Sequence, residues 1–169
     1  MDIIYFALQM ELDGKAFYLK SASEAAHPEL KKILINLAEE EQRHYQFFKR
    51  LKEGQDRIAG AELESGSPTM DLNKTLFRQL AEQGKSASFG ADVRKVWTEA
   101  LAIEEKVEKM YREEAEKEKD ATKKRLLSRI ADEEKNHVYL IDNMLSFMAD
   151  PGGFADSSNF KNFLSWEGR

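Results

Sequence analysis

Two of the three histidines stand three residues after a glutamate, in the segments Glu41 to His44 and Glu134 to His137. Side chains at positions i and i+3 lie on one face of a helix, a turn apart, so both members of each pair can reach the same ion. The chain has no cysteine, so a metal here must sit on His, Glu or Asp. The pattern therefore indicates two related metal-binding segments.

A further glutamate precedes each segment by the same distance: Glu11 lies 30 residues before Glu41, and Glu104 lies 30 residues before Glu134. All four interrupt apolar stripes at positions that should face a core, where an uncompensated carboxylate is costly. One Glu from each of two helices plus Glu-x-x-His from each of two others is the dimetal carboxylate arrangement of helical bundles. The predicted ligands are Glu11, Glu41, His44, Glu104, Glu134 and His137.

The charges are consistent with that set, because four carboxylates balance two divalent cations and imidazoles are neutral ligands. The competing interpretation is a solvated acidic face with two surface histidines. The placement of the acids on apolar stripes disfavours it.

Other side chains near these positions allow two interpretations. Tyr18 and Tyr111 each follow a predicted ligand by seven residues. They are most simply ordinary core tyrosines, and the alternative is that they donate hydrogen bonds to ligand carboxylates. One or two residues before two of the ligands stand Glu39, Glu40, Asp132 and Glu133, and we interpret them as solvated in preference to the alternative that they support the ligands.

Helical periodicity predicts four long helices, at about 3–26, 28–52, 92–119 and 120–148. Pro28 suits the first turn of the second, and Asp120 can cap the fourth. Residues 54–90 are rich in glycine, with a clear break at 65–68, and are interpreted as a crossover containing one short helix at about 72–83.

The second half of the chain repeats the first at an offset of 93 residues. Leu34, Ala38, Glu40, Glu41 and His44, for example, return as Leu127, Ala131, Glu133, Glu134 and His137. We therefore expect an all-α fold in which two helical hairpins form one four-helix bundle over residues 1–149. Residues 150–169 form an aromatic tail expected to pack on the bundle or on a partner subunit.

Composition excludes several classes of function. The net charge of −5 and the absence of an isolated Lys/Arg cluster argue against nucleic-acid binding. No apolar run is long enough to span a membrane, and no basic leader precedes the first helix, so a cytoplasmic protein is the expectation.

The segments 7–18, 34–44, 100–111 and 127–137 resemble the ferritin-like superfamily and, within it, the rubrerythrin-type proteins. The resemblance covers about residues 3–148. It implies an antiparallel bundle, two iron ions per chain, reaction with oxygen or peroxide in defence against oxidative stress, a separate electron-donor protein and a homodimer. It also implies that Glu41 and Glu134 bridge the irons, that Glu11 and Glu104 are terminal ligands, and that one histidine binds each iron.

Two departures from that family are visible. Without cysteine the chain cannot carry the Cys-ligated rubredoxin domain of full-length rubrerythrins, and Val107 stands where their sites have an extra glutamate. The six-residue set is closer in type to bacterioferritin and to the di-iron hydroxylases.

These departures leave several functions open. The first is a di-iron peroxidase or oxidoreductase, followed by ferroxidase and iron storage, then by hydroxylation of a small substrate. A metal-free helical interaction module comes last. Zinc or manganese could also occupy the site.

Overall fold

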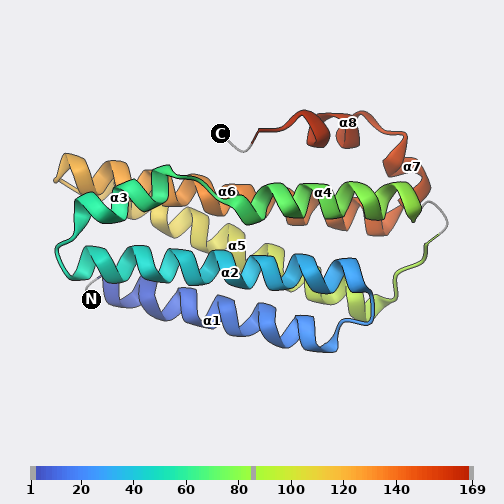
Figure 1. Ribbon diagram of the computed structural model, residues 1–169, viewed down its shortest axis with the longest axis horizontal. Coiled ribbons are helices and arrows are strands. Elements are labelled where there is room, and N and C mark those ends of the chain that lie inside the picture. Colours follow the sequence, from blue (N-terminus) through green and yellow to red (C-terminus); the bar gives the residue numbers. More distant parts are fainter. Residues whose placement is uncertain (1–2, 85–86, 168–169) are drawn as a thin grey trace.

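The computed structural model describes residues 3–84 and 87–167, which contain helices and no strand. Four long helices form the bundle: α1 (Ile3–Glu24), α2 (Pro28–Lys52), α5 (Ala91–Lys117) and α6 (Ala121–Ala149). Helix α1 packs along α2, and α5 packs along α6, so two antiparallel hairpins lie side by side (Figure 1). The predicted ferritin-like all-α bundle is confirmed. None of the helices in the described part of the chain is long and apolar enough to cross a membrane.

The ends of the helices follow from local chemistry. Pro28 occupies the first turn of α2, where its missing N–H costs nothing. The Asp120 side chain accepts a hydrogen bond from the backbone N–H of Lys123 and so caps α6, as predicted.

The crossover contains more helix than the sequence indicated. Instead of one helix at 72–83 it has two, α3 (Asp56–Glu64) and α4 (Pro68–Gln83). The break between them lies at Gly66, whose φ of 80° suits glycine. Helix α4 starts early because Ser67 caps it and Pro68 opens it. Helix α3 forms although it contains Gly60, because Ala59 and Leu63 are buried in the core.

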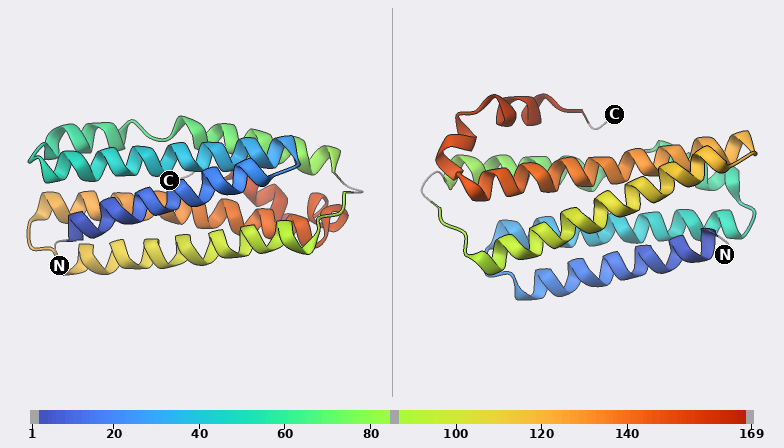
Figure 2. Two further views of the ribbon diagram at one scale, coloured as in Figure 1. Left: turned by 90° about the horizontal axis from the view of Figure 1, so that it is seen from below. Right: turned by 180° about the vertical axis from the view of Figure 1, so that it is seen from behind.

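The crossover and the tail cover one side of the bundle. Helices α3 and α4 lie over α2 and α6, and the tail helices α7 (Pro151–Ala155) and α8 (Ser158–Ser165) follow from the end of α6 (Figure 2). The rings of Phe154, Phe160 and Phe163 are buried. All three pack around Phe77 of α4, and the Phe163 ring centroid is 4.9 Å from that of Phe77. The tail thus packs on its own chain.

Two apolar clusters fill the bundle and leave a polar layer between them. One lies toward the α1–α2 turn and includes Leu37, Trp97 and Ile141. The other lies toward the α5–α6 turn and includes Phe48 and Ile130. The layer between them falls in the middle of all four long helices, where the predicted ligands stand.

Candidate metal centre

All six predicted ligands meet in the middle of the bundle. Each long helix supplies one glutamate, and α2 and α6 each add the histidine one turn further along. None of these residues is more than 5 % exposed. The set is Glu11, Glu41, His44, Glu104, Glu134 and His137.

The two imidazoles face the carboxylates through their Nδ1 atoms. His44 Nδ1 lies 2.9 Å from Glu134 Oε1 and 3.6 Å from Glu11 Oε2. His137 Nδ1 lies 3.3 Å from the other oxygen of Glu134, 3.4 Å from Glu41 Oε1 and 3.5 Å from Glu104 Oε1. Glu134 therefore contacts both histidines and lies between them.

The ligand atoms form two overlapping groups, each with atoms within 4.8 Å of one another. One group is Glu11, Glu41 and His44, and the other is Glu41, Glu104, Glu134 and His137; a third group of this kind, Glu40, His44 and His137, includes a residue outside the predicted set. Glu41 belongs to both groups. The arrangement thus offers two neighbouring cation positions with shared carboxylates between them.

Several of these buried polar atoms have no hydrogen-bond partner within the described structure. They are Glu11 Oε2, Glu41 Oε1, both oxygens of Glu134, and the Nδ1 atoms of His44 and His137; His137 Nε2, on the other side of its ring, also has none. A buried polar group without a partner costs about 1–3 kcal/mol, and such groups are few in native proteins. Here they converge on one place and are all oxygen or nitrogen donors. The donor set therefore fits metal ions such as iron, zinc or manganese.

Burial and the neighbouring charges shift the pKa values of the buried carboxylates. Burial, followed by the nearby charges of Glu104, Glu11 and Glu134, raises the pKa of Glu41 well above its usual range. Burial also raises the pKa of Glu134, although His44 partly offsets it. Burial alone would raise the pKa of Glu104 too, but the charge of His137 and the contacts with His137, Tyr18 and Glu134 together outweigh it, and the pKa falls.

The pKa values of the two histidines are raised, whereas burial ordinarily lowers the pKa of an imidazole. Burial would lower the pKa of His44 and of His137, but the charge of Glu134 acts on the first and that of Glu104 on the second. Together with close contacts to the other carboxylates, these charges raise both pKa values well above the usual range. Without metal, bound protons therefore neutralise part of the carboxylate charge that metal cations would otherwise neutralise.

Two tyrosines complete the inner layer. The Tyr18 hydroxyl donates to Glu104 Oε1, and the Tyr111 hydroxyl donates to Glu11 Oε1. Burial and the neighbouring carboxylates raise the pKa of both hydroxyls well above the usual range, so each remains a protonated donor. Tyr18 and Tyr111 therefore donate hydrogen bonds to ligand carboxylates, which the sequence analysis gave as the alternative to ordinary core tyrosines.

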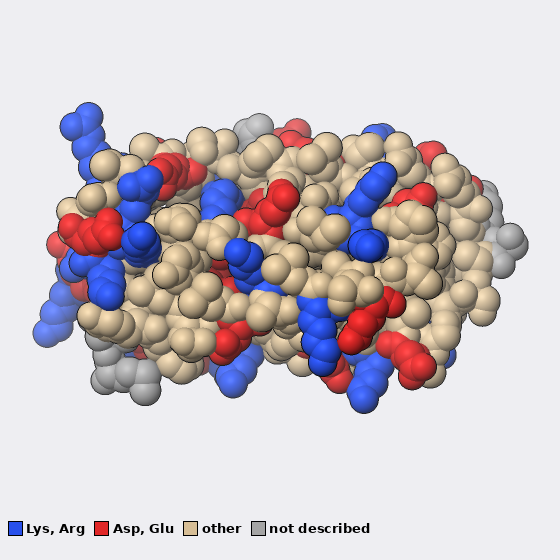
Figure 3. Space-filling model, turned by 60° about the horizontal axis from the view of Figure 1, so that its bottom comes forward, with Lys and Arg blue, Asp and Glu red and all other residues tan. Residues whose placement is uncertain are grey.

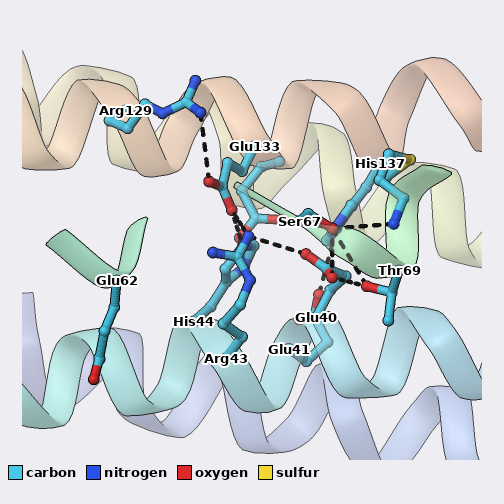
Figure 4. A network of polar contacts seen from close by, with 12 residues as sticks. Glu40, Glu41, Arg43, His44, Glu62, Ser67, Thr69, Arg129, Glu133 and His137 are labelled. Carbon is cyan, nitrogen blue, oxygen red and sulfur yellow. Dashed lines mark hydrogen bonds and ion pairs between the residues drawn. The ribbon is translucent and has the colours of Figure 1, made fainter. Parts of the chain in front are cut away.

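A second polar layer lies outside the histidines, between α2 and α6 (Figure 4). Glu133 Oε2 lies 3.1 Å from His44 Nε2, and the Arg43 guanidinium joins Glu133 to Glu40. The interpretation of Glu40 and Glu133 as solvated was wrong, because they are only 2 % and 4 % exposed. Their repetition at the 93-residue offset was the signal that could have identified them.

The crossover closes over this outer layer. Ser67 Oγ donates to Glu40 Oε1 over 2.6 Å, and the Thr69 hydroxyl donates to the same oxygen. Ser67 caps α4 and Thr69 lies in its first turn, so the start of α4 covers Glu40. Together with the Arg43 guanidinium, these hydroxyls hold the Glu40 carboxylate in place.

The comparison with known families agrees with this geometry. The Rubrerythrin family model matches residues 2–145, which is most of the chain. The chain belongs to the rubrerythrin family. No curated protein and no solved structure matches it.

Within this rubrerythrin bundle, the two halves differ at one pair of equivalent positions. Gly14 and Val107 each lie three residues after a predicted ligand and correspond to each other at the 93-residue offset. A Cβ atom on Gly14 would lie 2.5 Å from Glu41 Oε2, so the absent side chain makes room for that carboxylate. Val107 instead belongs to the apolar cluster near the α5–α6 turn and is 6 % exposed.

Proposed function

We propose that the six buried side chains bind two iron ions and that the protein is a non-haem di-iron oxidoreductase. It would reduce hydrogen peroxide or oxygen, using electrons from a separate donor protein. The observation that carries the proposal is the convergence of unpartnered carboxylate and imidazole atoms in the middle of a rubrerythrin-family bundle.

The residues would divide between the two ions as follows. Glu11 and His44 would hold one ion, and Glu104 and His137 the other, because each pair lies within one of the two groups of ligand atoms. Glu41 and Glu134 would lie between the ions. Two ferrous ions, when bound, supply the two electrons that convert hydrogen peroxide and two protons into two molecules of water.

The protein itself contributes position and electrostatics. Tyr18 and Tyr111 hold the carboxylates of Glu104 and Glu11 in place through their hydroxyls, and Glu133 orients the His44 ring through Nε2. The apolar clusters on both sides keep bulk water away from the layer. Low local polarity strengthens every interaction between a ligand and a cation there.

The test is anaerobic loading with Fe(II), followed by a single addition of peroxide or of oxygen, monitored optically. We expect two iron ions per chain and rapid oxidation by at least one of the two oxidants. The control is a Glu41→Ala, Glu134→Ala double variant, which removes both shared carboxylates and should bind little iron. Fewer than one ion per chain in the wild type would contradict the metal assignment. Full loading without oxidation by either oxidant would contradict the oxidoreductase.

A further inference from the structure

A cavity of about 620 Å³ lies on the side of the bundle that the crossover covers. Its outer walls are the α3–α4 break, the facing part of α6 and the tail residue Glu167. Glu40, Glu133 and His137 also line it and are buried, so they lie at its inner end. A cation with six water molecules occupies about 200 Å³ at roughly 30 Å³ per water, so a hydrated cation fits. We call this space the outer cavity.

The outer cavity reaches the metal centre at His137. The Nδ1 atom of this ring faces the carboxylates of the centre, and its Nε2 atom, on the opposite edge, has no hydrogen-bond partner among the described residues. The ring therefore separates the cavity from the centre and is held from the side of the centre only. One ligand atom each of Glu40, His44 and His137 lie within 4.8 Å of one another. A cation at the inner end of the cavity thus meets oxygen and nitrogen donors before it reaches the centre.

The internal repeat supplies a control, because His44 occupies the equivalent position in the first hairpin. His44 does not line the outer cavity. Its Nε2 atom lies 3.1 Å from Glu133 Oε2, and the Arg43 guanidinium also binds that oxygen. An ion pair therefore closes the His44 side of the centre.

The His137 side lacks the equivalent contacts. At the 93-residue offset, Glu40 corresponds to Glu133, and Asn136 corresponds to Arg43. Hydroxyl groups at the start of α4 bind the Glu40 carboxylate, while the Nε2 atom of His137 is left without a partner in the described part of the chain. Asn136 has no charge with which to hold a carboxylate over the ring. The two sides of the centre therefore differ, and only the His137 side adjoins the cavity.

Carboxylates dominate the charge of the outer cavity. Among the described residues that line it, five are acids and one is a base: Glu40, Glu64, Asp71, Glu133 and Glu167, and Arg129. Arg43 and Arg125 pair with lining acids from outside the cavity, and the acids still outnumber the guanidinium groups five to three. By contrast, Figure 3 shows acidic and basic side chains interspersed on the α1 side of the molecule. A cleft lined by one sign of charge concentrates ions of the opposite sign.

We propose that the outer cavity is the route by which divalent cations enter the metal centre, and that they enter past His137. This route rests on the proposed binding of metal by the six predicted ligands. The exposed acids at the mouth attract the cation, and Glu40 replaces part of its water shell. The His137 ring turns aside without breaking a hydrogen bond at Nε2, whereas the His44 ring would have to leave Glu133. Ions therefore enter on one side of the centre only.

The first test is the rate at which the metal-free chain takes up Zn(II), followed by stopped flow with a fluorescent zinc indicator. The test variant is Glu64→Gln, Asp71→Asn, which removes two charges from the mouth of the cavity and no predicted ligand. We expect uptake to slow by about 10-fold at low ionic strength. The difference should nearly vanish at about 1 M salt, where screening acts within about 3 Å. The final stoichiometry should stay that of the wild type.

The matched control is Glu62→Gln, Asp92→Asn, which makes the same change in net charge. Glu62 is ion-paired with an arginine, as Glu64 is. Asp92 lies in the first turn of α5, as Asp71 lies in the first turn of α4. Neither control residue lines the outer cavity, so uptake should keep the wild-type rate.

The two double variants separate the route from the metal assignment. Equal slowing of both would show that net charge determines the rate, and would overturn the route, as would an unchanged rate in the test variant. In either case a normal stoichiometry leaves the proposed function intact. A wild type that takes up no Zn(II) would overturn the metal assignment and the route together. Circular dichroism confirms that each variant folds.

Free imidazole tests the side of entry. His137→Gly and His44→Gly each remove one predicted ligand and leave a hole the size of an imidazole ring. Excess imidazole should restore the Zn(II) stoichiometry of His137→Gly, because the outer cavity leads to that hole. It should not restore that of His44→Gly, where Glu133 and Arg43 close the way. Any other pattern would overturn entry past His137. The stoichiometry is measured without peroxide or oxygen, so the result is independent of the proposed oxidoreductase activity.

Discussion

Substituting Gly14 by alanine should weaken metal binding without destabilising the metal-free protein. The new Cβ would lie 2.5 Å from Glu41 Oε2 and 3.2 Å from its Cδ, whereas Cβ contacts below 3.0 Å essentially do not occur. The carboxylate must therefore retreat by about 0.5 Å, which exceeds the roughly 0.2 Å tolerance of metal–ligand distances. We expect metal affinity to fall by about 10- to 100-fold, as when an outer partner of a ligand is lost.

The same substitution should increase the stability of the metal-free protein slightly. Alanine in the middle of a helix is favoured over glycine by about 0.5–1 kcal/mol, and an unliganded Glu41 side chain is free to move aside. The matched control is Gly60→Ala in α3, where the new Cβ meets only Leu126 Cδ2, at 3.3 Å. Chelator competition measures the affinity, and thermal unfolding of the metal-free chains measures stability. If Gly14→Ala binds metal as tightly as Gly60→Ala does, Gly14 does not make room for Glu41.

Three further predictions concern the same centre. His44→Ala and His137→Ala should each weaken one ion more than the other, because the two histidines belong to different groups of predicted ligands; equal loss of both ions from both variants in an iron titration would argue against this division. Val107→Glu should destabilise the metal-free protein by about 1–3 kcal/mol, because it buries a carboxylate. The same substitution should speed single-turnover oxidation of the diferrous protein by peroxide, provided the new acid reaches the metal; an unchanged rate with the acid bound would refute a role for the missing glutamate. Finally, the free energy of unfolding of the metal-free protein should increase as the pH falls from about 8 to about 5. The pKa values of Glu41, Glu134 and both histidines are raised, so the folded state binds more protons than the unfolded state in this range. Thermal unfolding of the metal-free and metal-bound forms measures this gain, and parallel pH profiles would contradict it. Below that range the lowered pKa values of Glu104 and Glu133 act against folding.

The sequence alone was sufficient to predict the bundle and the six side chains at its centre. Helical periodicity is a local property, and a Glu-x-x-His pair shares a helical face whatever surrounds it. The glutamates could be identified because they interrupt apolar stripes, and the 93-residue repeat related the two hairpins. For these features the information lies within a few helical turns of each residue, so no tertiary contact was needed.

The tertiary structure decided which other polar groups serve the centre. Glu40 looked solvated because its helix neighbours are charged, but in the folded chain its carboxylate accepts hydrogen bonds from Ser67 and Thr69, which lie 27 and 29 residues away. Tyr18 and Tyr111 reach carboxylates 86 and 100 residues away on the opposite hairpin. The space that Gly14 leaves for Glu41 also exists only between packed helices. Each of these contacts joins different helices, and the periodicity of a single helix contains no information about its partner.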